Sequence, residues 1–568
     1  MKEESRMSQI IECVPNFSEG RDMTVIREIT DAIESVDGVA LLDVDPGRAT
    51  NRTVVTFAGD PKQVVEAAVR AAQKSADLID MRQHQGEHPR FGAMDVCPLV
   101  PVSGISIEET ASYARQLAKR LGEEVGLTIF CYEHAATTEE RRNLAHVRAG
   151  EYEGLKEKLA NPDWQPDFGP TEVNLKSGAT AVGAREFLIA YNVNLNTTST
   201  RRANAVAFDV REKGRIKREG DPLTGEIVRD HAGAPVYIPG SLKAVKAIGW
   251  FIEEYGIAQI SMNLTDLSQT SLHAAFDEVC RKAEARGMRV TGSELVGLVP
   301  LGALLDAGRY YLRKQGRSLG IPDHEIIKIA VKSLGLDDLK PFEPLEKIIE
   351  YKLASQSPRP TLLVDRSLTG FVESTASEAP APGGGSVSAA VGALGAALGS
   401  MVANLSAHKR GWDARWEEFS NWAEQGKELY EELLGLVDED TAAFDGILAA
   451  FRLPQTSEAE QAARHQAIQE ATKRAIEVPL QVMEASLRSM KILEAMAHEG
   501  NPASVSDAGV GALCARTAVR GAFMNMQINS GDLEDKEVVE DLLARGRALD
   551  EKAAALESEI LEAVSNKL

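Results

Sequence analysis

The sequence has few cysteines and no surplus of basic residues. Lys and Arg together number 63 against 85 Asp and Glu, so the formal net charge is −22. Nucleic acids and anionic membranes attract proteins through basic surfaces, so this charge argues against both as partners. Any anionic substrate must therefore be bound by local arginines. The cysteines are odd in number and have no paired spacing, which is typical of a reducing compartment: Cys13, Cys97, Cys131, Cys280 and Cys514.

The start of the chain lacks the features of a secretory signal. Met1-Lys2-Glu3-Glu4-Ser5 has no cationic segment leading into an apolar one, so we expect a cytoplasmic protein. A charge-free stretch from Val387 to Leu405 contains a GxxxG pattern and could be mistaken for a membrane span. Its apolar residues are mostly Ala and Gly, and polar residues interrupt it. We interpret it as a buried helix that lets neighbouring backbones approach closely.

The 568 residues, 43% of them hydrophobic, are too many for one core. Upstream of about residue 360, apolar clusters alternate with longer amphipathic runs, which is typical of α/β structure. Downstream there is almost no strand signal. We therefore expect two α/β subdomains followed by an all-α helical bundle. The predicted divisions are residues 1–186, residues 187–353, a linker over 354–366, and residues 367–568.

The hydrophobic pattern also predicts individual elements. In the first subdomain we expect strands at 10–14, 40–44, 53–57 and 128–131, and helices at 25–35, 62–78 and 107–125. In the last domain we expect helices at 387–406, 412–451, 458–497, 506–529 and 534–565, with a kink at Pro479. Helices this long with short connections suggest an up-and-down bundle whose seams continue into a partner subunit. Two X-Pro steps within residues 355–360 predict an extended interdomain linker.

A first candidate catalytic residue is His88, in a Gly- and Pro-rich loop over residues 85–98. Gly86, Pro89 and Gly92 disfavour helix, so His84 and His88 do not form an HxxxH metal site, and we expect no metal. A loop histidine is usually bonded to a backbone carbonyl. Here the neighbouring charged residues, Glu87, Arg90 and Asp95, can tune an imidazole for proton transfer near neutral pH.

A second candidate is the glycine run Gly383-Gly384-Gly385-Ser386 ahead of a helix. Its backbone N–H groups would lie at the positive helix end, which suits a carboxylate or phosphate. No Gly-Lys-Ser/Thr follows, so it is not a P-loop. The alternative is a tight turn with Ser386 as the N-cap. The sequence favours neither.

A third candidate is Asp440, which falls on an apolar helical stripe where a hydrophobic residue is expected. A carboxylate facing a core is either paired or has a raised pKa. The stripe comprises Leu433, Val437, Phe444, Ile447 and Phe451. Asp438 lies about 200° around the same helix. The structural alternative is an ion pair between Asp440 and Lys473 or Arg474.

These segments resemble a known family along nearly the whole chain. The segments 11–20, 41–45, 86–90, 95–98 and 183–190 look like glutamate formimidoyltransferase. The segment Ala381 to Val387, and Leu436-Val437-Asp438 with Asp440, look like formimidoyltetrahydrofolate cyclodeaminase. The order of the two parts is similar to that of the bifunctional formimidoyltransferase-cyclodeaminase family of histidine breakdown.

The resemblance implies two folate reactions. A formimino group passes from formiminoglutamate to tetrahydrofolate, a co-substrate of one-carbon metabolism, and ring closure then gives methenyltetrahydrofolate and ammonia. It also implies binding of folate polyglutamates and a homo-oligomer through helical-domain dimers, with a ring-shaped octamer as in the family. By similarity, His88 is the transferase catalytic residue and Asp440 the cyclodeaminase one. The family's folate loop falls on residues 169–178, of which Gly169, Pro170 and the Gly178-Ala179-Thr180 end match.

The chemistry suggests further binding residues, because both substrates are anionic. Arginines near the motifs can bind carboxylates, although each can equally be a solvated surface charge: Arg48, Arg52, Arg90 and Arg185. Asp45 can orient His88 or the substrate. Two other readings remain. The helical half could serve only as an oligomerisation scaffold for a transferase, or the chain could be a cysteine-dependent amidinohydrolase using Cys13 or Cys97.

Overall fold

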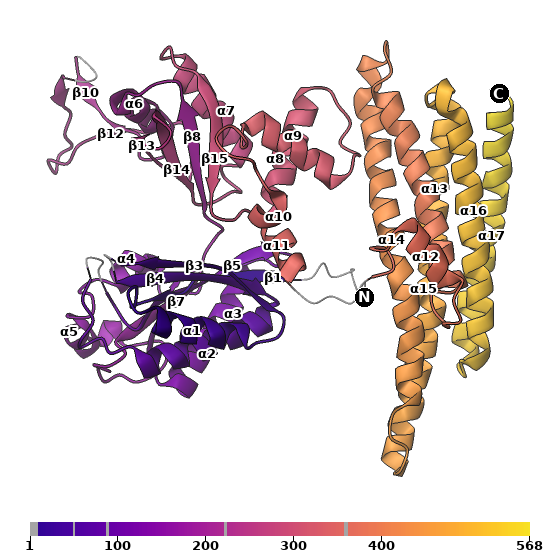
Figure 1. Cartoon of the computed structure of the whole chain (residues 1–568), viewed down its shortest axis with the longest axis horizontal. Coiled ribbons are helices and arrows are strands. Elements are labelled where there is room, and N and C mark those ends of the chain that lie inside the picture. Colours follow the sequence, from indigo (N-terminus) through magenta and orange to yellow (C-terminus); the bar gives the residue numbers. More distant parts are fainter. Residues whose placement is uncertain (1–8, 49–50, 87–89, 221–223, 357–361) are drawn as a thin grey trace. The chain divides into compact units, whose positions relative to one another are not determined.

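The computed structural model describes residues 9–48, 51–86, 90–220, 224–356 and 362–568. The chain divides into two compact units, which we describe separately. The first unit comprises Met1–Ala307 and Leu334–Pro358, and the second comprises Gly308–Ser333 and Arg359–Leu568. The first is α/β and the second is helical, which confirms the predicted fold class (Figure 1).

A seven-stranded mixed sheet forms the centre of the first subdomain. Its order is β1-β4-β2-β5-β7-β6, with β3 beside β4 and β1 also paired with β5. The strands are β1 (Ile10–Cys13), β2 (Asn16–Phe17), β3 (Val39–Gly47), β4 (Arg52–Gly59), β5 (Met94–Ser103), β6 (Thr128–Glu133) and β7 (Ala179–Ala184). β7 runs parallel to β5 and β6, and the other pairs are antiparallel.

Three amphipathic helices, α1 (Met23–Glu34), α2 (Pro61–Leu78) and α3 (Ile107–Arg120), build one hydrophobic core with this sheet. Each begins at a polar N-cap: Asp22, Asp60 and Ser106. Short helices α4 (Leu144–Val147) and α5 (Leu155–Ala160) build a second core with Phe91 and Phe130. The remaining turns are a π-helical turn at Leu121–Val125 and 3₁₀ turns at Glu139–Arg142 and Pro162–Trp164.

The second subdomain has the β-α-β-β-α-β order of a split βαβ unit. Its elements are β8 (Ile189–Leu195), α6 (Thr200–Val210), β13 (Val245–Ile252), β14 (Ile257–Leu264), α7 (Leu272–Glu284) and β15 (Val290–Val296). The antiparallel sheet has the order β13-β14-β8-β15. Helix α6 packs closely on β13, because a Cβ at Gly249 would lie 2.3 Å from the Asn204 backbone nitrogen.

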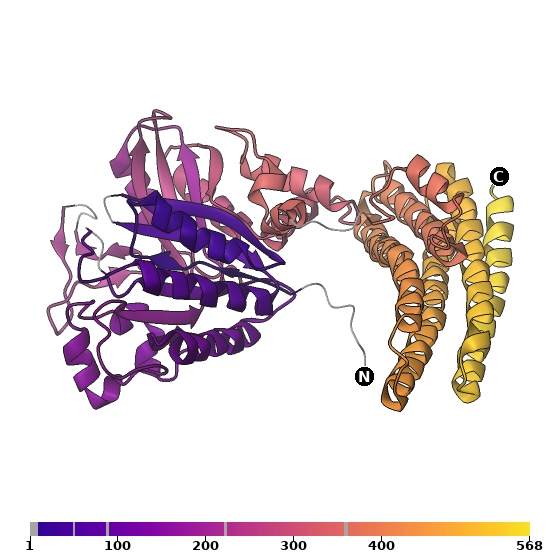
Figure 2. The same ribbon diagram turned by 60° about the horizontal axis from the view of Figure 1, so that its bottom comes forward.

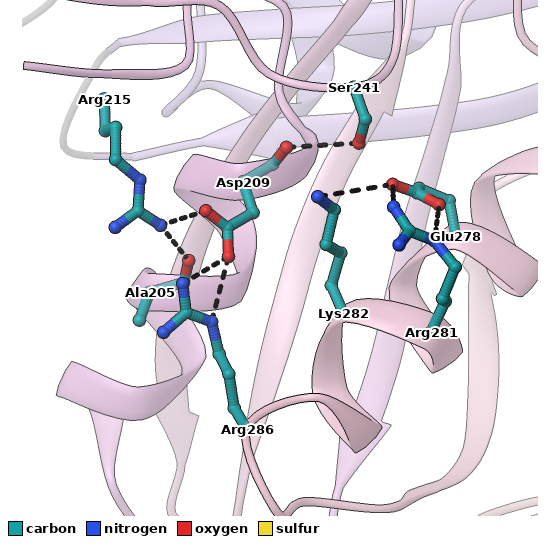
Figure 3. A network of polar contacts seen from close by, with 8 residues as sticks. All are labelled: Ala205, Asp209, Arg215, Ser241, Glu278, Arg281, Lys282 and Arg286. Carbon is teal, nitrogen blue, oxygen red and sulfur yellow. Dashed lines mark hydrogen bonds and ion pairs between the residues drawn. The ribbon is translucent and has the colours of Figure 1, made fainter.

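A Gly- and Pro-rich insertion between α6 and β13 forms two small antiparallel sheets. They pair β10 (Arg218–Glu219) with β11 (Glu226–Ile227), and β12 (Tyr237–Ile238) with β9 (Arg215–Ile216). Figure 3 shows how Asp209 at the end of α6 anchors this insertion, through ion pairs with Arg215 of β9 and Arg286 after α7. The Ser241 hydroxyl also donates to the Asp209 carbonyl, at 3.1 Å. The insertion is therefore tied to the two helices of the subdomain.

The second unit is a bundle of long helices that lie side by side in both Figure 1 and Figure 2. They are α13 (Gly384–Ala407), α14 (Trp416–Phe451), α15 (Glu458–Glu499), α16 (Val505–Asn529) and α17 (Lys536–Ser565), preceded by α12 (Leu368–Thr375). Short 3₁₀ turns lie at Asp413–Arg415, Pro502–Ser504 and Ser530–Asp532. The predicted ends of the five long helices agree with these to within four residues.

The small residues of helix α13 allow it to pack closely against neighbouring helices. A Cβ at Gly395 would lie 2.9 Å from the Gly511 carbonyl oxygen of α16, and one at Gly392 would lie 2.7 Å from Ser486 Oγ of α15. The helix is long and apolar enough to span a membrane, but 61% of its most apolar window is buried inside this unit. This packing supports the reading of α13 as a buried bundle helix.

Four details differ from the predictions. The segment Gly308–Ser333, which contains part of α8 (Leu301–Lys314) and most of α9 (Asp323–Leu334), belongs to the helical unit. After α10 (Pro344–Lys347), helix α11 (Ile349–Gln356) includes the first two residues of the predicted extended linker. Strand β3 continues beyond residue 44, so Asp45 lies in a strand and not in a loop. Phe451, predicted on the buried stripe of α14, is 52% exposed.

The first difference has a clear physical cause. The turn before α9 is pressed against the bundle, because a Cβ at Gly320 would lie 2.2 Å from the Ala423 backbone carbon. The Gly320 carbonyl accepts from Asn404 Nδ2 at 2.8 Å, and Ser420 Oγ accepts from the Leu319 N–H at 3.0 Å. Lys427 of α14, 9% exposed, forms an ion pair with Asp323. These long-range contacts are not visible in a local sequence pattern.

Candidate functional site

One end of the seven-stranded sheet gathers most of the predicted transferase residues. Along this end, Thr53 of β4 pairs with Phe17 of β2, which pairs with Met94 of β5. Strand β7 begins there too, at Ala179, which pairs with Thr128 of β6. The candidates at this end are Asp45, Arg48, Arg52, Gly169, Pro170, Gly178, Ala179 and Thr180.

The centre of this end is a group of charged side chains that are largely withdrawn from solvent. Asp95, 1% exposed, lies between two arginines, with its Oδ2 3.4 Å from Arg52 Nη1 and 2.8 Å from Arg148 Nη2. Arg52 also donates to Asn16 Oδ1 from Nε at 2.9 Å. Burial lowers the pKa of the Arg52 guanidinium, and the Asp95 carboxylate opposes this effect. The sequence predicted Arg52 but gave no signal for Arg148, an isolated basic residue after a four-residue helix.

Asn51 ties three segments of this end together. Its Oδ1 accepts from the Gly20 N–H at 3.0 Å, and its Nδ2 donates to the Gln85 carbonyl at 2.9 Å. His84 Nε2 lies 2.7 Å from the Asn51 carbonyl oxygen and therefore donates to it. The loop that leads to residue 86 is thus bonded to the β3–β4 turn. His88 itself lies outside the described residues.

Three further charged candidates differ in their contacts: Asp45, Arg48 and Arg90. Asp45 on β3 and Arg48 just beyond it are exposed. Arg90 is engaged, since its Nε and Nη2 donate to Glu153 Oε1 at 2.9 and 2.7 Å and its Nη1 donates to the Met81 carbonyl. Its guanidinium also stacks 4.8 Å from the centre of the Tyr152 ring. In this arrangement Arg90 ties the backbone at Met81 to Glu153.

The matched ends of the predicted folate loop are built into the sheet edge. Gly169 and Gly178 have φ of +84° and +69°, which favours glycine. A Cβ at Gly169 would lie 1.9 Å from the Leu127 carbonyl oxygen. The Pro170 carbonyl accepts from Thr128 Oγ1 at 3.0 Å. Ala179 and Thr180 are buried strand residues, and the Thr180 hydroxyl donates to the Met94 carbonyl at 2.7 Å. These residues shape the loop, and the two buried side chains offer no exposed surface.

Arg185 lies at the other end of the sheet. It follows the six residues of β7, so it lies roughly 20 Å from Ala179 along the strand direction. There it faces Glu12 of β1, which is 6% exposed. Burial raises the pKa of the Glu12 carboxyl to about 7, and the charge of Arg185 opposes this shift. The structure therefore does not bring Arg185 together with the other transferase candidates.

The two candidate thiols are not activated. Cys13 and Cys97 are fully buried, with their Sγ atoms 3.5 Å apart. Burial raises the pKa of the Cys13 thiol well above its usual value, and the neighbouring Cys97 adds to the effect. A reactive cysteine needs an exposed thiol with a lowered pKa. This geometry speaks against the cysteine-dependent reading.

In the helical unit, Asp440 of α14 meets the N-terminus of α13. Its Oδ2 accepts from Ser386 Oγ at 2.9 Å, and the Ser386 backbone also donates to the carboxylate. Burial raises the pKa of Asp440, and these two hydrogen bonds oppose the shift. Among the described residues no ion pair to Asp440 is seen: Arg474 pairs with Glu439 and Lys473 with Glu477. The predicted structural alternative for Asp440 is therefore wrong.

The glycine run makes this approach possible. A Cβ at Gly385 would lie 2.0 Å from Asp440 Oδ1, so only glycine leaves room for the carboxylate. Gly383 is the N-cap of α13, and Ser386 lies inside the first turn. The predicted alternative with Ser386 as N-cap is therefore wrong. Gly384 approaches Asn525 of α16, whose Nδ2 would lie 3.3 Å from its Cβ.

A cavity of about 950 Å³ lies beside this contact, between α12, α14 and the segment that enters α13. Its lining includes Leu362, Leu363, Arg366, Glu373, Ala381, Pro382, Asp438, Thr441, Ala442 and Asp445. Asp438 has a structural role as well, since its Oδ1 accepts from the Leu363 N–H at 2.7 Å. In the part of the chain that the structure describes, no group of three or more His, Cys, Asp or Glu side chains could hold a metal ion.

Models of known protein families match three segments of the chain. "Formiminotransferase domain, N-terminal subdomain" matches residues 10–185, "Formiminotransferase domain" matches residues 190–354, and "Formiminotransferase-cyclodeaminase" matches residues 367–548. The three matches follow one another along the chain, and the gaps between them are residues 186–189 and 355–366.

Curated relatives match the whole chain or one part of it. Formimidoyltransferase-cyclodeaminase of Mus musculus is 44% identical over 93% of this chain and 94% of its own length. Glutamate formimidoyltransferase of Streptococcus pyogenes is 40% identical, over 54% of this chain and 94% of its own. Methenyltetrahydrofolate cyclohydrolase of Methylorubrum extorquens is 36% identical, over 36% of this chain and 98% of its own.

Proposed function

The chain belongs to the formimidoyltransferase-cyclodeaminase family, and from this premise we propose that it catalyses two successive folate reactions. The α/β unit transfers the formimino group of formiminoglutamate to N5 of tetrahydrofolate. The helical unit closes the ring to methenyltetrahydrofolate and releases ammonia. The observation that carries the second activity is the half-buried Asp440 carboxyl at the N-terminus of α13, because an oligomerisation scaffold needs no such group.

In the transfer reaction, His88 acts as the acid and base. Attack of folate N5 on the amidine carbon needs a base for the N–H proton, and departure of the glutamate amine needs an acid. A histidine with a pKa near neutrality can do both in turn. This assignment is supported by the family resemblance around residues 86–90 and by the location of the preceding residues at the end of the sheet that holds Arg52 and Asp95.

In the ring closure, folate N10 bonds to the formimino carbon and the bond from that carbon to the nitrogen breaks. The nitrogen leaves as ammonia only if it is protonated, and Asp440 supplies that proton. A raised pKa keeps part of the Asp440 population protonated closer to neutral pH. Among the substrate-binding candidates, Arg48 suits the substrate carboxylates best. Arg52 is engaged with Asp95 and Arg90 with Glu153, and Arg185 lies at the other end of the sheet.

The proposal extends to the setting of the enzyme. It acts in histidine breakdown, in the cytoplasm, on folate polyglutamates, without a metal, and as a homo-oligomer. Oligomerisation through the helical unit is supported by apolar side chains that α13 and α16 leave exposed on adjacent helices: Leu394, Met401, Leu405, Val510, Leu513, Met524 and Ile528. A single-sided apolar face of this kind is typical of an interface between subunits.

The test is to follow methenyltetrahydrofolate by absorbance from formiminoglutamate and tetrahydrofolate, and ammonia release from supplied formiminotetrahydrofolate. His88→Ala should lower transfer by roughly 10² to 10⁴-fold and leave the second reaction intact. Asp440→Asn should lower ammonia release by a similar factor with its thermal midpoint unchanged. Asp541→Asn, the same change at an exposed position of α17, is the matched control and should remain active. A stable Asp440→Asn variant that releases ammonia at the normal rate would end this assignment.

A second candidate for the helical unit is hydrolysis of methenyltetrahydrofolate, because a cyclohydrolase from Methylorubrum extorquens matches this part of the chain. Supplied methenyltetrahydrofolate distinguishes the two. It should persist if the unit is a cyclodeaminase, and its absorbance should fall if the unit is a cyclohydrolase.

A further inference from the structure

A hydroxyl pair connects Asp440 to the neighbouring cavity. Ser386 Oγ, fully buried, donates to Asp440 Oδ2 at 2.9 Å and lies 3.2 Å from Thr441 Oγ1. The second contact can run in either direction, since both atoms are hydroxyls. Thr441 lines the cavity of about 950 Å³. The three side chains therefore form one hydrogen-bonded row from the half-buried Asp440 carboxyl to the cavity.

Asp440 does not line the cavity itself. Its carboxylate is held against Gly385, where a Cβ would lie within 2.6 Å of both carboxylate oxygens. Of the three side chains in the row, only Thr441 lines the cavity. A substrate in that space would therefore meet the Thr441 hydroxyl before the carboxylate.

The cavity has the size and lining of a small-molecule site. Its volume lies within the range of roughly 300 to 1,000 Å³ in which proteins bind drug-sized ligands. Apolar walls come from Leu362, Leu363, Ala381 and Pro382. The charged part of the lining holds one arginine, Arg366, and four carboxylates: Glu373, Asp438, Glu439 and Asp445. The pterin ring of folate has apolar faces and N–H donors, so it suits apolar walls beside carboxylates.

We propose that this cavity is the folate chamber of the cyclodeaminase site and that Thr441 is the residue that delivers the proton to the leaving nitrogen. The proposal rests on the cyclodeaminase activity proposed above. The formimino nitrogen carries one hydrogen and needs two more to leave as ammonia. N10 gives up the first as it bonds to the formimino carbon. The second comes from protonated Asp440: it passes to Ser386 Oγ, Ser386 passes its own proton to Thr441 Oγ1, and Thr441 passes its own to the nitrogen. The bond from the nitrogen to the carbon then breaks, ammonia leaves, and methenyltetrahydrofolate remains as a cation, with Asp440 as the carboxylate to which Ser386 Oγ donates.

The first experiment replaces the Thr441 hydroxyl. Thr441→Val keeps the shape of the side chain and removes the hydroxyl, whereas Thr441→Ser keeps the hydroxyl. With supplied formiminotetrahydrofolate, Thr441→Val should lower kcat for ammonia release by roughly 10²-fold, with KM and the thermal midpoint little changed. Thr441→Ser should restore most of kcat. A structural role would instead lower the thermal midpoint, and normal kcat in Thr441→Val would overturn the relay.

The second experiment fills the chamber. Ala442 is exposed and lines the cavity, so Ala442→Phe should raise KM for formiminotetrahydrofolate at least tenfold without unfolding α14. Ala449→Phe places the same side chain on an exposed position two turns along α14 and should leave KM unchanged. Unchanged KM in Ala442→Phe would overturn the location of the chamber.

The outcomes separate this inference from the proposed function. An active Asp440→Asn enzyme would overturn the role of Asp440 and the relay together. An inactive Asp440→Asn enzyme beside an active Thr441→Val enzyme would overturn the relay alone, because the proton would then reach the substrate by another route.

Discussion

At the scale of single residues, burial in the two units changes the chemistry of a few carboxyl groups. Glu12 and Asp440 both lie on regular elements, and the pKa of each is raised because the charged form loses water. The sequence indicated Asp440 through its place on an apolar stripe. It gave no comparable signal for Glu12, because a single polar residue in a short strand normally faces solvent.

Glu12→Gln should stabilise the α/β unit at neutral and higher pH. Burial raises the pKa of Glu12 from 4.5 to about 7 in the folded protein. The contribution of this carboxyl to the free energy of unfolding of the wild type is therefore fully present below pH 4.5 and is lost as the pH rises through 7. The loss corresponds to about 3 kcal/mol, at about 1.36 kcal/mol for each pKa unit. Thermal midpoints should diverge between pH 4.5 and pH 8.

The control for this change is Glu34→Gln, at an exposed position at the end of α1. Its thermal midpoint should follow that of the wild type at every pH. A Glu12→Gln protein whose stability keeps a constant offset from the wild type across this range would contradict the raised pKa of Glu12.

Gly385→Ala should abolish ammonia release while leaving formimino transfer unchanged. The added methyl group would overlap the Asp440 carboxylate, which must then leave Ser386. The matched control is Gly446→Ala on α14, where no heavy atom lies within 4 Å of the new Cβ. That change should be neutral or slightly stabilising, because Ala is the better helix former. Both activities and the thermal midpoints decide the outcome.

At the scale of elements, the long helices were predictable because their apolar period extends over many turns. Strand β3 was predicted too short, since it ends in Asp45, Pro46 and Gly47, which are residue types unusual in strands. They remain extended because they pair with Arg52, Thr53 and Val54 of β4. The far half of α14 was predicted to be buried, but Phe451 near its end is exposed.

The exposed stripe on α13 and α16 gives a prediction about assembly. Leu394 and Met524 are 60% and 55% exposed. Leu394→Glu with Met524→Glu should dissociate the oligomer, because charges in an apolar interface cost several kcal/mol unless they are paired. Sedimentation velocity measures the change. Leu345→Glu on α10, where the side chain is 67% exposed, is the control and should leave the oligomer intact. An unchanged sedimentation coefficient in the double variant would place the interface elsewhere.

At the scale of the whole molecule, the boundary between the units is not a single point in the sequence. Gly308–Ser333 belongs to the helical unit although the sequence continues into the α/β unit afterwards. The residues that line the cavity and those of the Asp440, Ser386 and Thr441 row nevertheless all lie within 362–568. The deaminase site that we propose therefore draws its described residues from the helical unit.

Separating the chain at Pro358 should give a helical piece that still releases ammonia from formiminotetrahydrofolate. This piece should melt a few degrees lower than its unit does in the full chain, because the Leu319, Gly320 and Asp323 contacts are lost. Lys427→Ala supplies the control. It should destabilise the helical unit in the full chain and have less effect in the separated piece, where its partner Asp323 is already absent. An inactive, folded helical piece would show that the deaminase site needs residues from the other half.

The sequence by itself determined the two kinds of structure, the ends of the five long helices to within four residues, and the family. It also singled out His88 and Asp440 as catalytic candidates. These features depend on local periodicity and on contiguous motifs, which are visible in the amino-acid sequence alone. The tertiary structure decided which residues meet: Arg148 with Asp95, Arg185 with Glu12 at the far end of the sheet, and Ser386 with Asp440 and Thr441. Such pairs join residues tens of positions apart. Their geometry follows from strand register and helix packing, which depend on the whole fold.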